Sequence, residues 1–345
     1  MTRPSAFTAS TRQRVAATLL AVVGMAVLAG CAGSPAAPGL AEPSPGAVLP
    51  AGTSPAAPSA ASTGPVLTSP LTGLPVVGDT ATRPVVGVAV RTGNGLPAPV
   101  GLDRADLVYV AFPLPGRQRS VALFQSQDAD RVGPVDDTRP IDNKLITVVH
   151  GVLEHAGGTP GFVTRTDNED VPQWSAVVHP SAFSLDAAGQ LYGSTADARA
   201  VPGTKPAVDG LVAFRAASNS PMAAPAPVTI RVAGEPDLGL TWDPTSRTWN
   251  GTMGALPVRA TNIIVQQVDY ARLALPHSTA TEGDPVVFGK GGALVLSAEQ
   301  ILDGSWNRAG RKVLTSYVGA DGVPVRLAPG TTVVLLVPTG TPIAR

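Results

Sequence analysis

Cysteine and histidine are scarce in this chain: its 345 residues include one cysteine and four histidines. A single cysteine excludes a disulfide framework and any cysteine-based zinc site. His150 and His155 are five residues apart, and so would fall on different faces of a helix, unlike the pair four apart that binds zinc in metalloproteases. We therefore predict no metal site, and no motif in the sequence predicts a cofactor.

Charge is also sparse. Lys+Arg and Asp+Glu each total 25, so the formal net charge is zero, and charged residues make up only 14% of the chain. A nucleic-acid-binding surface requires a concentrated basic patch, and the sequence has no basic block, so we expect no nucleic-acid partner. Hydrophobic residues make up 44%, which is enough for the core of one large domain or two ordinary ones.

The first 30 residues have the pattern of a secretory signal peptide. Three arginines and no acidic residue precede an apolar run, Val15–Leu28. This run is shorter than the roughly 20 residues of a membrane span. The run ends in Leu-Ala-Gly-Cys31, which resembles the lipobox of bacterial lipoproteins. The resemblance implies that Cys31 carries diacylglyceryl and becomes the first mature residue. The alternative is an ordinary signal peptide followed by an incidental cysteine.

A low-complexity segment follows the cysteine. Of the 34 residues from 32 to 65, 28 are Ala, Pro, Gly or Ser, a composition that cannot bury enough apolar surface to order itself. A Pro/Ala-rich stretch, Asn219–Pro227, indicates a second boundary further on. The expected divisions are a signal peptide (1–30), the lipidated cysteine with a disordered tether (31–65), an N-terminal α/β part (66–220) and a mostly β C-terminal part (221–345).

The body is predicted to be mixed α+β and rich in strands. β-branched runs bounded by Gly and Pro predict strands, and the sequence around Asp243-Pro244 predicts a hairpin that brings Trp242 near Trp249. One main helix is expected from Pro140 to the Gly157-Gly158 pair, and a second short helix over Ala298–Leu302. The expected strands are Val85–Val90, Leu107–Phe112, Ser120–Phe124, Val228–Val232, Asn262–Val268 and Thr332–Val337.

Nucleophile and phosphate-loop motifs are missing. The chain has no G-x-S-x-G elbow, and Gly283–Lys290 has one residue too many for a Walker A loop. We interpret that segment as a glycine-rich turn between strands.

The densest polar stretch lies around the start of the main helix. Gln125, Gln127 and Arg139 could contact an anion near the helix N-terminus, although Asp136 and Asp137 would repel one and could instead cap the helix. After the helix, glycines allow backbone amides to approach a ligand closely or merely make a tight turn. The candidate ligand-binding residues are Gln125, Gln127, Arg139, His155, Gly157, Gly158 and Thr159.

The same segments resemble the YerB-like family of bacterial lipoproteins, a domain of unknown function with N- and C-terminal parts. The resemblance rests on the order of short motifs over residues 70–338, among them Pro70–Pro75, Phe124–Gln127, Gly304–Trp306 and Leu327–Thr331. It departs at three polar positions: Val110 stands where relatives carry Glu, Asp136 where they carry Arg, and His179-Pro180 keeps only part of a Pro-His-Asn segment. The resemblance implies an envelope lipoprotein and no established reaction.

Three functions remain open from the sequence. The first is a non-catalytic lipoprotein, anchored outside the cytoplasm through Cys31, that binds a cell-wall fragment or another envelope component. The second is a docking factor for envelope proteins, which would expose an apolar patch. The third is a cell-wall enzyme with Asp106, Asp142, Glu154 and His155 as acid/base candidates.

Overall fold

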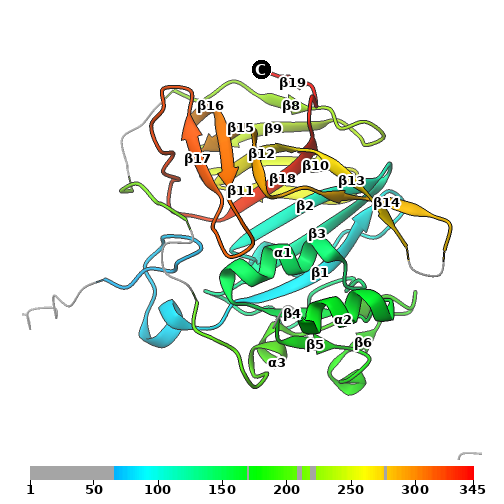
Figure 1. Ribbon diagram of the computed structural model, residues 1–345. Helices are drawn as coiled ribbons and strands as arrows, with labels where there is room; N and C mark the ends of the chain where they lie inside the picture. The colour runs from blue at the N-terminus through cyan, green and yellow to red at the C-terminus, as the bar shows by residue number, and fades with distance from the viewer. Residues whose placement is uncertain (1–65, 169–170, 208–211, 218–222, 276–277) are drawn as a thin grey trace, which may run out of the picture. The chain divides into compact units, whose positions relative to one another are not determined.

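A ten-stranded mixed sheet joins both parts of the chain (Figure 1). In the computed structural model, β2 from the N-terminal part pairs in parallel with β18 from the C-terminal part. The strands in spatial order are β17 (Ser316–Gly319), β16 (Gln300–Arg308), β15 (Gly289–Ser297), β12 (Asn262–Val268), β18 (Thr332–Pro338), β2 (Leu107–Leu114), β3 (Arg117–Phe124), β1 (Val86–Gly93), β4 (Val152–His155) and β5 (Gln173–Ser175).

The structure describes residues 66–168, 171–207, 212–217, 223–275 and 278–345. The predicted signal peptide, Cys31 and the tether lie outside these ranges, as does part of the predicted boundary over Asn219–Pro227. Residues Thr63–Arg345 cluster as one compact unit. Within the described ranges, every helix is too short or too polar to cross a membrane.

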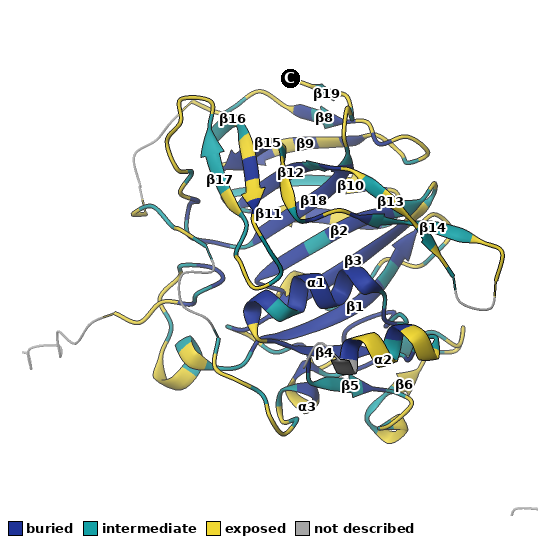
Figure 2. Ribbon diagram, viewed as in Figure 1, coloured by how far each residue is buried: buried dark blue, intermediate teal, exposed yellow. Residues whose placement is uncertain are grey.

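All six predicted strands are present in the structure. The central segments of β1, β12 and β18 are buried on both faces (Figure 2), as expected for runs of β-branched residues in the middle of a covered sheet. Successive side chains point to opposite faces: in β12, Ile263 and Val265 belong to one hydrophobic cluster, and Ile264 belongs to another. The sheet therefore separates two cores.

A second, five-stranded sheet covers one of these faces. The predicted hairpin forms its centre, with Trp242 opposite Trp249. Trp249 is fully buried, and its Nε1 donates a hydrogen bond to Ala298 O at 2.9 Å. In spatial order, its strands are β11 (Leu256–Ala260), β10 (Thr248–Met253), β9 (Leu238–Asp243), β8 (Val228–Ile230) and β19 (Ile343–Ala344).

The main helix is shorter than the sequence pattern predicts. The helix α1 runs from Pro140 to Ile146, and a 3-10 turn, Thr147–Val149, follows it. His150 then takes a left-handed conformation with φ 53°, which ends the helical run. The next residues form strand β4, which pairs in parallel with β1. The predicted helix to Gly157 is therefore wrong beyond Val149.

The second predicted helix, over Ala298–Leu302, is also wrong. Ala298 has φ 49° and lies in the tight turn between β15 and β16. Two helices were not predicted, α2 (Pro160–Asn168) and α3 (Thr195–Arg199). The remaining strands form two-stranded pairs, β13 (Tyr270–Ala274) with β14 (Thr281–Pro285) and β6 (Ser184–Leu185) with β7 (Leu191–Tyr192). The predicted mixed, β-rich body with a mostly β C-terminal part is confirmed at this level.

Ion pairs attach helix α1 to the β13–β14 hairpin. Arg139 Nε lies 2.7 Å from Glu282 Oε1, and Lys144 Nζ lies 2.6 Å from Asp284 Oδ2. Because α1 also buries Ile141 and Ile146 against the sheet, it is fixed from two sides. Gly283–Lys290, interpreted from the sequence as a glycine-rich turn, instead spans the end of β14, the connection at residues 286–288 and the start of β15, so that Gly283 and Gly289 lie in the strands.

Candidate functional site

The structure does not place Gln125, Gln127, Arg139 and His155 around one pocket. Gln125 is fully buried and accepts a hydrogen bond from Ser69 Oγ at 2.9 Å, which ties the N-terminal segment to the end of β3. Gln127 is exposed and accepts a hydrogen bond from Arg104. The side chains of Gln125 and Gln127 therefore make hydrogen bonds within the fold.

Arg139 faces a small cleft of about 60 Å³ near Asp136 and Glu282. Its guanidinium is paired with Glu282, while its backbone N–H donates to Asp142 Oδ2 at 2.7 Å. Asp142 therefore caps α1. Asp136, expected to repel an anion or cap the helix, instead pairs with Arg119 Nη1 at 2.8 Å.

His155 and the glycines after it form a packed junction. His155 Nδ1 donates to Gly157 O at 2.7 Å, and Nε2 lies 2.9 Å from the side-chain amide oxygen of Gln173. Burial lowers the pKa of His155 despite these contacts. Thr138 N–H donates to Gly157 O at 2.8 Å, and a Cβ at Gly158 would lie 2.9 Å from Thr138 Cγ2. The glycines thus allow this segment to pack against the residues that precede α1.

Thr159, the last candidate of this group, follows the glycines directly. Its Oγ1 is buried and has no hydrogen-bond partner among the described residues. Thr159 lies outside the cleft beside Arg139 and outside two larger cavities, of about 240 Å³ and 190 Å³. Its hydroxyl is thus left unsatisfied in the fold.

The three carboxylate candidates have separate environments. Asp106 accepts hydrogen bonds from the backbone N–H of Gln125 at 2.6 Å and of Ser126 at 2.7 Å, although desolvation still raises its pKa. Asp142 is paired with Arg119. The carboxylates of Asp106 and Asp142 are therefore both used in contacts within the fold.

Glu154 differs from the other two. It is fully buried, and neither of its carboxylate oxygens has a hydrogen-bond partner among the described residues. Desolvation, with a smaller contribution from Asp197, raises its pKa to about 8. Glu154 is therefore mostly protonated at neutral pH. The part of the chain that the structure describes holds no cluster of His, Cys, Asp and Glu suited to a metal ion.

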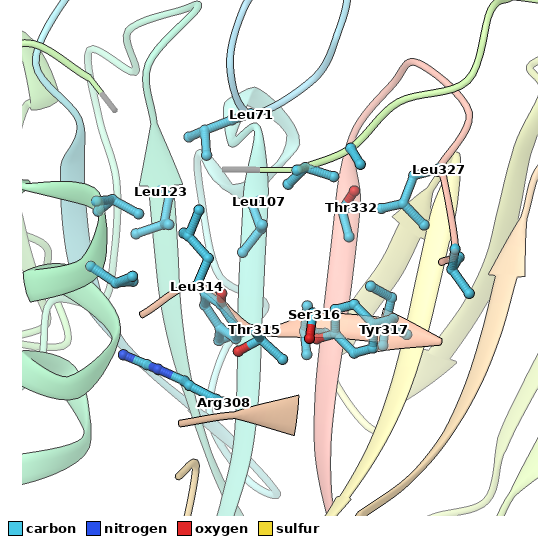
Figure 3. Close-up of a pocket in the computed structure, with 18 of the residues that line it drawn as sticks. Leu71, Leu107, Leu123, Arg308, Leu314, Thr315, Ser316, Tyr317, Leu327 and Thr332 are labelled. Carbon is cyan, nitrogen blue, oxygen red and sulfur yellow. The ribbon is translucent and has the colours of Figure 1, made fainter. Parts of the chain in front are cut away.

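Sequence reasoning missed a cavity of about 240 Å³ on the face of the ten-stranded sheet that carries α1. Adjacent strands form its floor: Leu107 and Tyr109 of β2 are in register with Thr332 and Val334 of β18. The 3-10 turn after α1 contributes Val148 and Val149. The lining is completed by Leu71, Leu123, Ile264, Arg308, Leu327 and the segments 212–213, 314–317 and 324–325 (Figure 3).

The cavity is apolar except on one side. In Figure 3, Leu71, Leu107 and Leu123 lie near one another, and Arg308, Thr315 and Tyr317 lie along a different side, with Arg308 and Tyr317 at its two ends. Arg308 is only 2% exposed. A signal for this site exists in the sequence: in Trp306-Asn-Arg308, alternation places an arginine on the same side of the strand as a buried tryptophan. The site was not predicted because its lining comes from distant segments.

The fold and the cavity together define a two-part α+β protein with an apolar pocket and no recognisable catalytic centre among the described residues. Two family models match the sequence: the N-terminal domain of a protein of unknown function, DUF3048, over residues 71–200, and the C-terminal domain of the same family over 228–334. The chain therefore belongs to the DUF3048 family, the YerB-like family whose motifs it resembles.

One solved structure has the same fold. The crystal structure of the YerB protein from Bacillus subtilis aligns with a TM-score of 0.65 and 19% sequence identity, and the alignment covers 81% of this chain and 100% of that one. No curated protein matches this chain.

Proposed function

We propose that this protein is an extracytoplasmic lipoprotein that binds a small envelope component in the cavity above β2 and β18. The cavity carries the proposal. Protein interiors are close-packed and contain few voids larger than a water molecule, whereas this cavity measures about 240 Å³ and is mostly apolar with a few polar groups on one side. Such a composition is typical of small-molecule binding sites.

The carboxylates favour binding over catalysis. General acid/base chemistry needs carboxyl groups that converge on one substrate. Asp106 is held by the backbone of residues 125 and 126, and Asp142 is held by Arg119. Neither Asp106, Asp142 nor Glu154 lines the 240 Å³ cavity. A role in docking envelope proteins, or in cell-wall chemistry, is the alternative if the cavity binds nothing.

The N-terminal segment supports the proposed location outside the cytoplasm. A diacylglyceryl group on Cys31 would provide stable anchoring, because two acyl chains bind a membrane far more firmly than one. The 34 residues from 32 to 65 would span on the order of 30 Å as a flexible coil. The body would then stand clear of the headgroups while remaining close to lipids and cell-wall material.

A thermal-shift screen tests the binding function. The protein would be residues 32–345, which retain the whole compact unit Thr63–Arg345, and the panel would hold muropeptide fragments, single-chain amphiphiles and sugars. A ligand at a hundred times its Kd stabilises the fold by about 2.7 kcal/mol, which raises the Tm. Leu314→Trp fills the cavity, while Val323→Trp alters an exposed residue outside it. The proposal expects a shift that only Leu314→Trp abolishes.

Two results would overturn this proposal. The first is a panel in which no compound raises the Tm. The second is a shift in Tm that survives Leu314→Trp unchanged, which would place binding elsewhere.

The lipid anchor has its own test, in which cells expressing wild type or Cys31→Ser are labelled with a palmitate analogue and fractionated. The expected result is labelled protein in membranes for wild type and unlabelled, released protein for Cys31→Ser.

A further inference from the structure

Arg308 is held in a fixed orientation beside the cavity. It is the last residue of β16, and its Nη2 donates hydrogen bonds to Lys144 O at 2.6 Å and to Arg311 O at 2.9 Å. The guanidinium carbon also lies 4.9 Å from the ring centroid of Phe288. Because these contacts come from three different segments, the guanidinium cannot swing into solvent without breaking them.

Among the described residues, no acidic side chain pairs with Arg308. Within the described ranges, its hydrogen-bond acceptors are neutral backbone carbonyls, it forms no ion pair, and its Nη1 makes no hydrogen bond. Burial lowers the pKa of Arg308, but an arginine remains charged at neutral pH. A buried charge is normally paired, so the free N–H donors of this guanidinium are suited to binding an anion.

A phenolic hydroxyl adds a donor near Arg308. Tyr109 lines the cavity, and its hydroxyl has no hydrogen-bond partner among the described residues. Tyr317 donates to Gln266 Oε1 at 2.8 Å. Burial raises the pKa of both tyrosines, so both remain protonated, and Tyr109 is the one whose hydroxyl hydrogen is available near Arg308.

From this geometry, and resting on the proposed binding function, we infer that the cavity binds a single-chain amphiphile with one anionic head. The carboxylate or phosphate head accepts hydrogen bonds from Arg308 Nη1 and Tyr109 OH, and the apolar chain lies along Leu107, Leu123 and Leu71 (Figure 3). The volume of about 240 Å³ equals roughly eight water volumes, so the chain is a short or medium one.

The test compares octyl ligands that differ only in the head. Octanoate, octyl phosphate, octanol and octyltrimethylammonium are titrated into residues 32–345 by isothermal calorimetry below their micellar concentrations. Both anions are expected to bind at least tenfold more tightly than the alcohol or the cation. The ratio between octanoate and octyl phosphate then assigns the head as carboxylate or phosphate.

Two matched variants locate the head. Arg308→Gln keeps a hydrogen-bond donor and removes the charge, and it is expected to weaken the binding of the anions at least tenfold while leaving octanol unchanged. Lys312 lies four residues away and lines a different cavity, of about 190 Å³, with His150 and Lys205. Lys312→Gln is therefore expected to change anion binding less than twofold.

Several outcomes overturn the inference. Equal affinity for the anionic and cationic octyl ligands contradicts the inference. An affinity for the anions that falls with Lys312→Gln and not with Arg308→Gln also contradicts it. If Arg308→Gln does not fold, the comparison of the four head groups on the wild-type protein still decides whether the cavity prefers an anionic head. When all four octyl ligands bind equally and Leu314→Trp abolishes binding, only the inference fails. When none of them binds, the inference fails, and the proposed function fails as well if the rest of the screening panel is silent.

Discussion

Arg119 and Asp142 form a buried ion pair at the base of helix α1. Arg119 Nε donates to Asp142 Oδ1 at 2.9 Å, and the two side chains are 5% and 0% exposed. Asp142 also accepts the backbone N–H of Arg139, the residue before the helix. The pair thus joins strand β3 to the start of α1, whose last residues lead to the wall of the cavity.

The first prediction is that Asp142→Asn destabilises the protein by about 3 kcal/mol, because removing one partner leaves a buried charge without compensation. Arg119 retains Asp136, which keeps the loss at the lower end of the usual range. Urea denaturation measures the change. Asp237→Asn is the control, since Asp237 and Arg231 are 57% and 50% exposed, and an exposed pair contributes less than about 1 kcal/mol. Equal stability of the two variants would contradict the structural role.

The second prediction concerns pH and Glu154. Its pKa in the folded protein is about 8, against 4.5 for the free side chain, so the unfolded chain loses this proton at lower pH than the folded protein. The contribution of Glu154 to stability is therefore complete below about pH 4.5 and falls as pH rises toward 8. The slope is at most about 1.4 kcal/mol per pH unit.

Replacing Glu154 with Gln removes this titration. The difference in unfolding free energy between wild type and Glu154→Gln, measured in urea from pH 5 to pH 8, is expected to shift steadily in favour of the variant. Other titrating groups, His155 among them, cancel in that difference. Glu299→Gln, the same substitution at a residue in the turn between β15 and β16 that is not fully buried, serves as the control. A pH-independent difference for Glu154→Gln would contradict the prediction.

The six strands named from the sequence could be predicted because local composition determines each of them, whereas β4 and the start of β16 were predicted as helix. Asn262–Val268, for example, is the predicted strand and also the observed β12. The end of the main helix could not be predicted from local composition. Val148, Val149 and Val152 fit a helical period, but Val152 pairs with Val86 in a parallel ladder, and this distant contact outweighs the local pattern. The same reasoning explains Ala298, whose neighbours suit a helix but whose turn is imposed by β15 and β16.

The cavity escaped prediction for a related reason. Its polar groups include Tyr109, Arg308 and Tyr317, which are up to 208 residues apart in sequence, and no short motif links them. The sequence candidates around Arg139 and His155 do meet in space, through the contact of Thr138 with Gly157. That meeting forms a packed junction, because glycines there allow backbone to pack against backbone. Proximity of polar residues in sequence was therefore a poor guide to the position of the cavity.

The last prediction tests whether β17 closes the cavity. Gly304 of β16 pairs with Gly319 of β17, and a Cβ at position 304 would lie 2.2 Å from Val318 O. Because that atom is backbone, Gly304→Ala must displace β17, which carries Ser316 and Tyr317 of the cavity lining. We expect a loss of about 1–3 kcal/mol in stability and weaker binding of octanoate.

Gly310→Ala is the matched control for this variant. Its added Cβ would have Val313 Cγ2 as its nearest neighbour, at 4.0 Å, so no atom has to move. Calorimetric titration with octanoate, together with urea denaturation, compares the two proteins. If Gly304→Ala loses stability yet binds octanoate as tightly as Gly310→Ala, β17 supports the sheet without closing the cavity, and the ligand must enter and be held from another side. If it loses both together, strand pairing at Gly304 and ligand retention are one property of the fold.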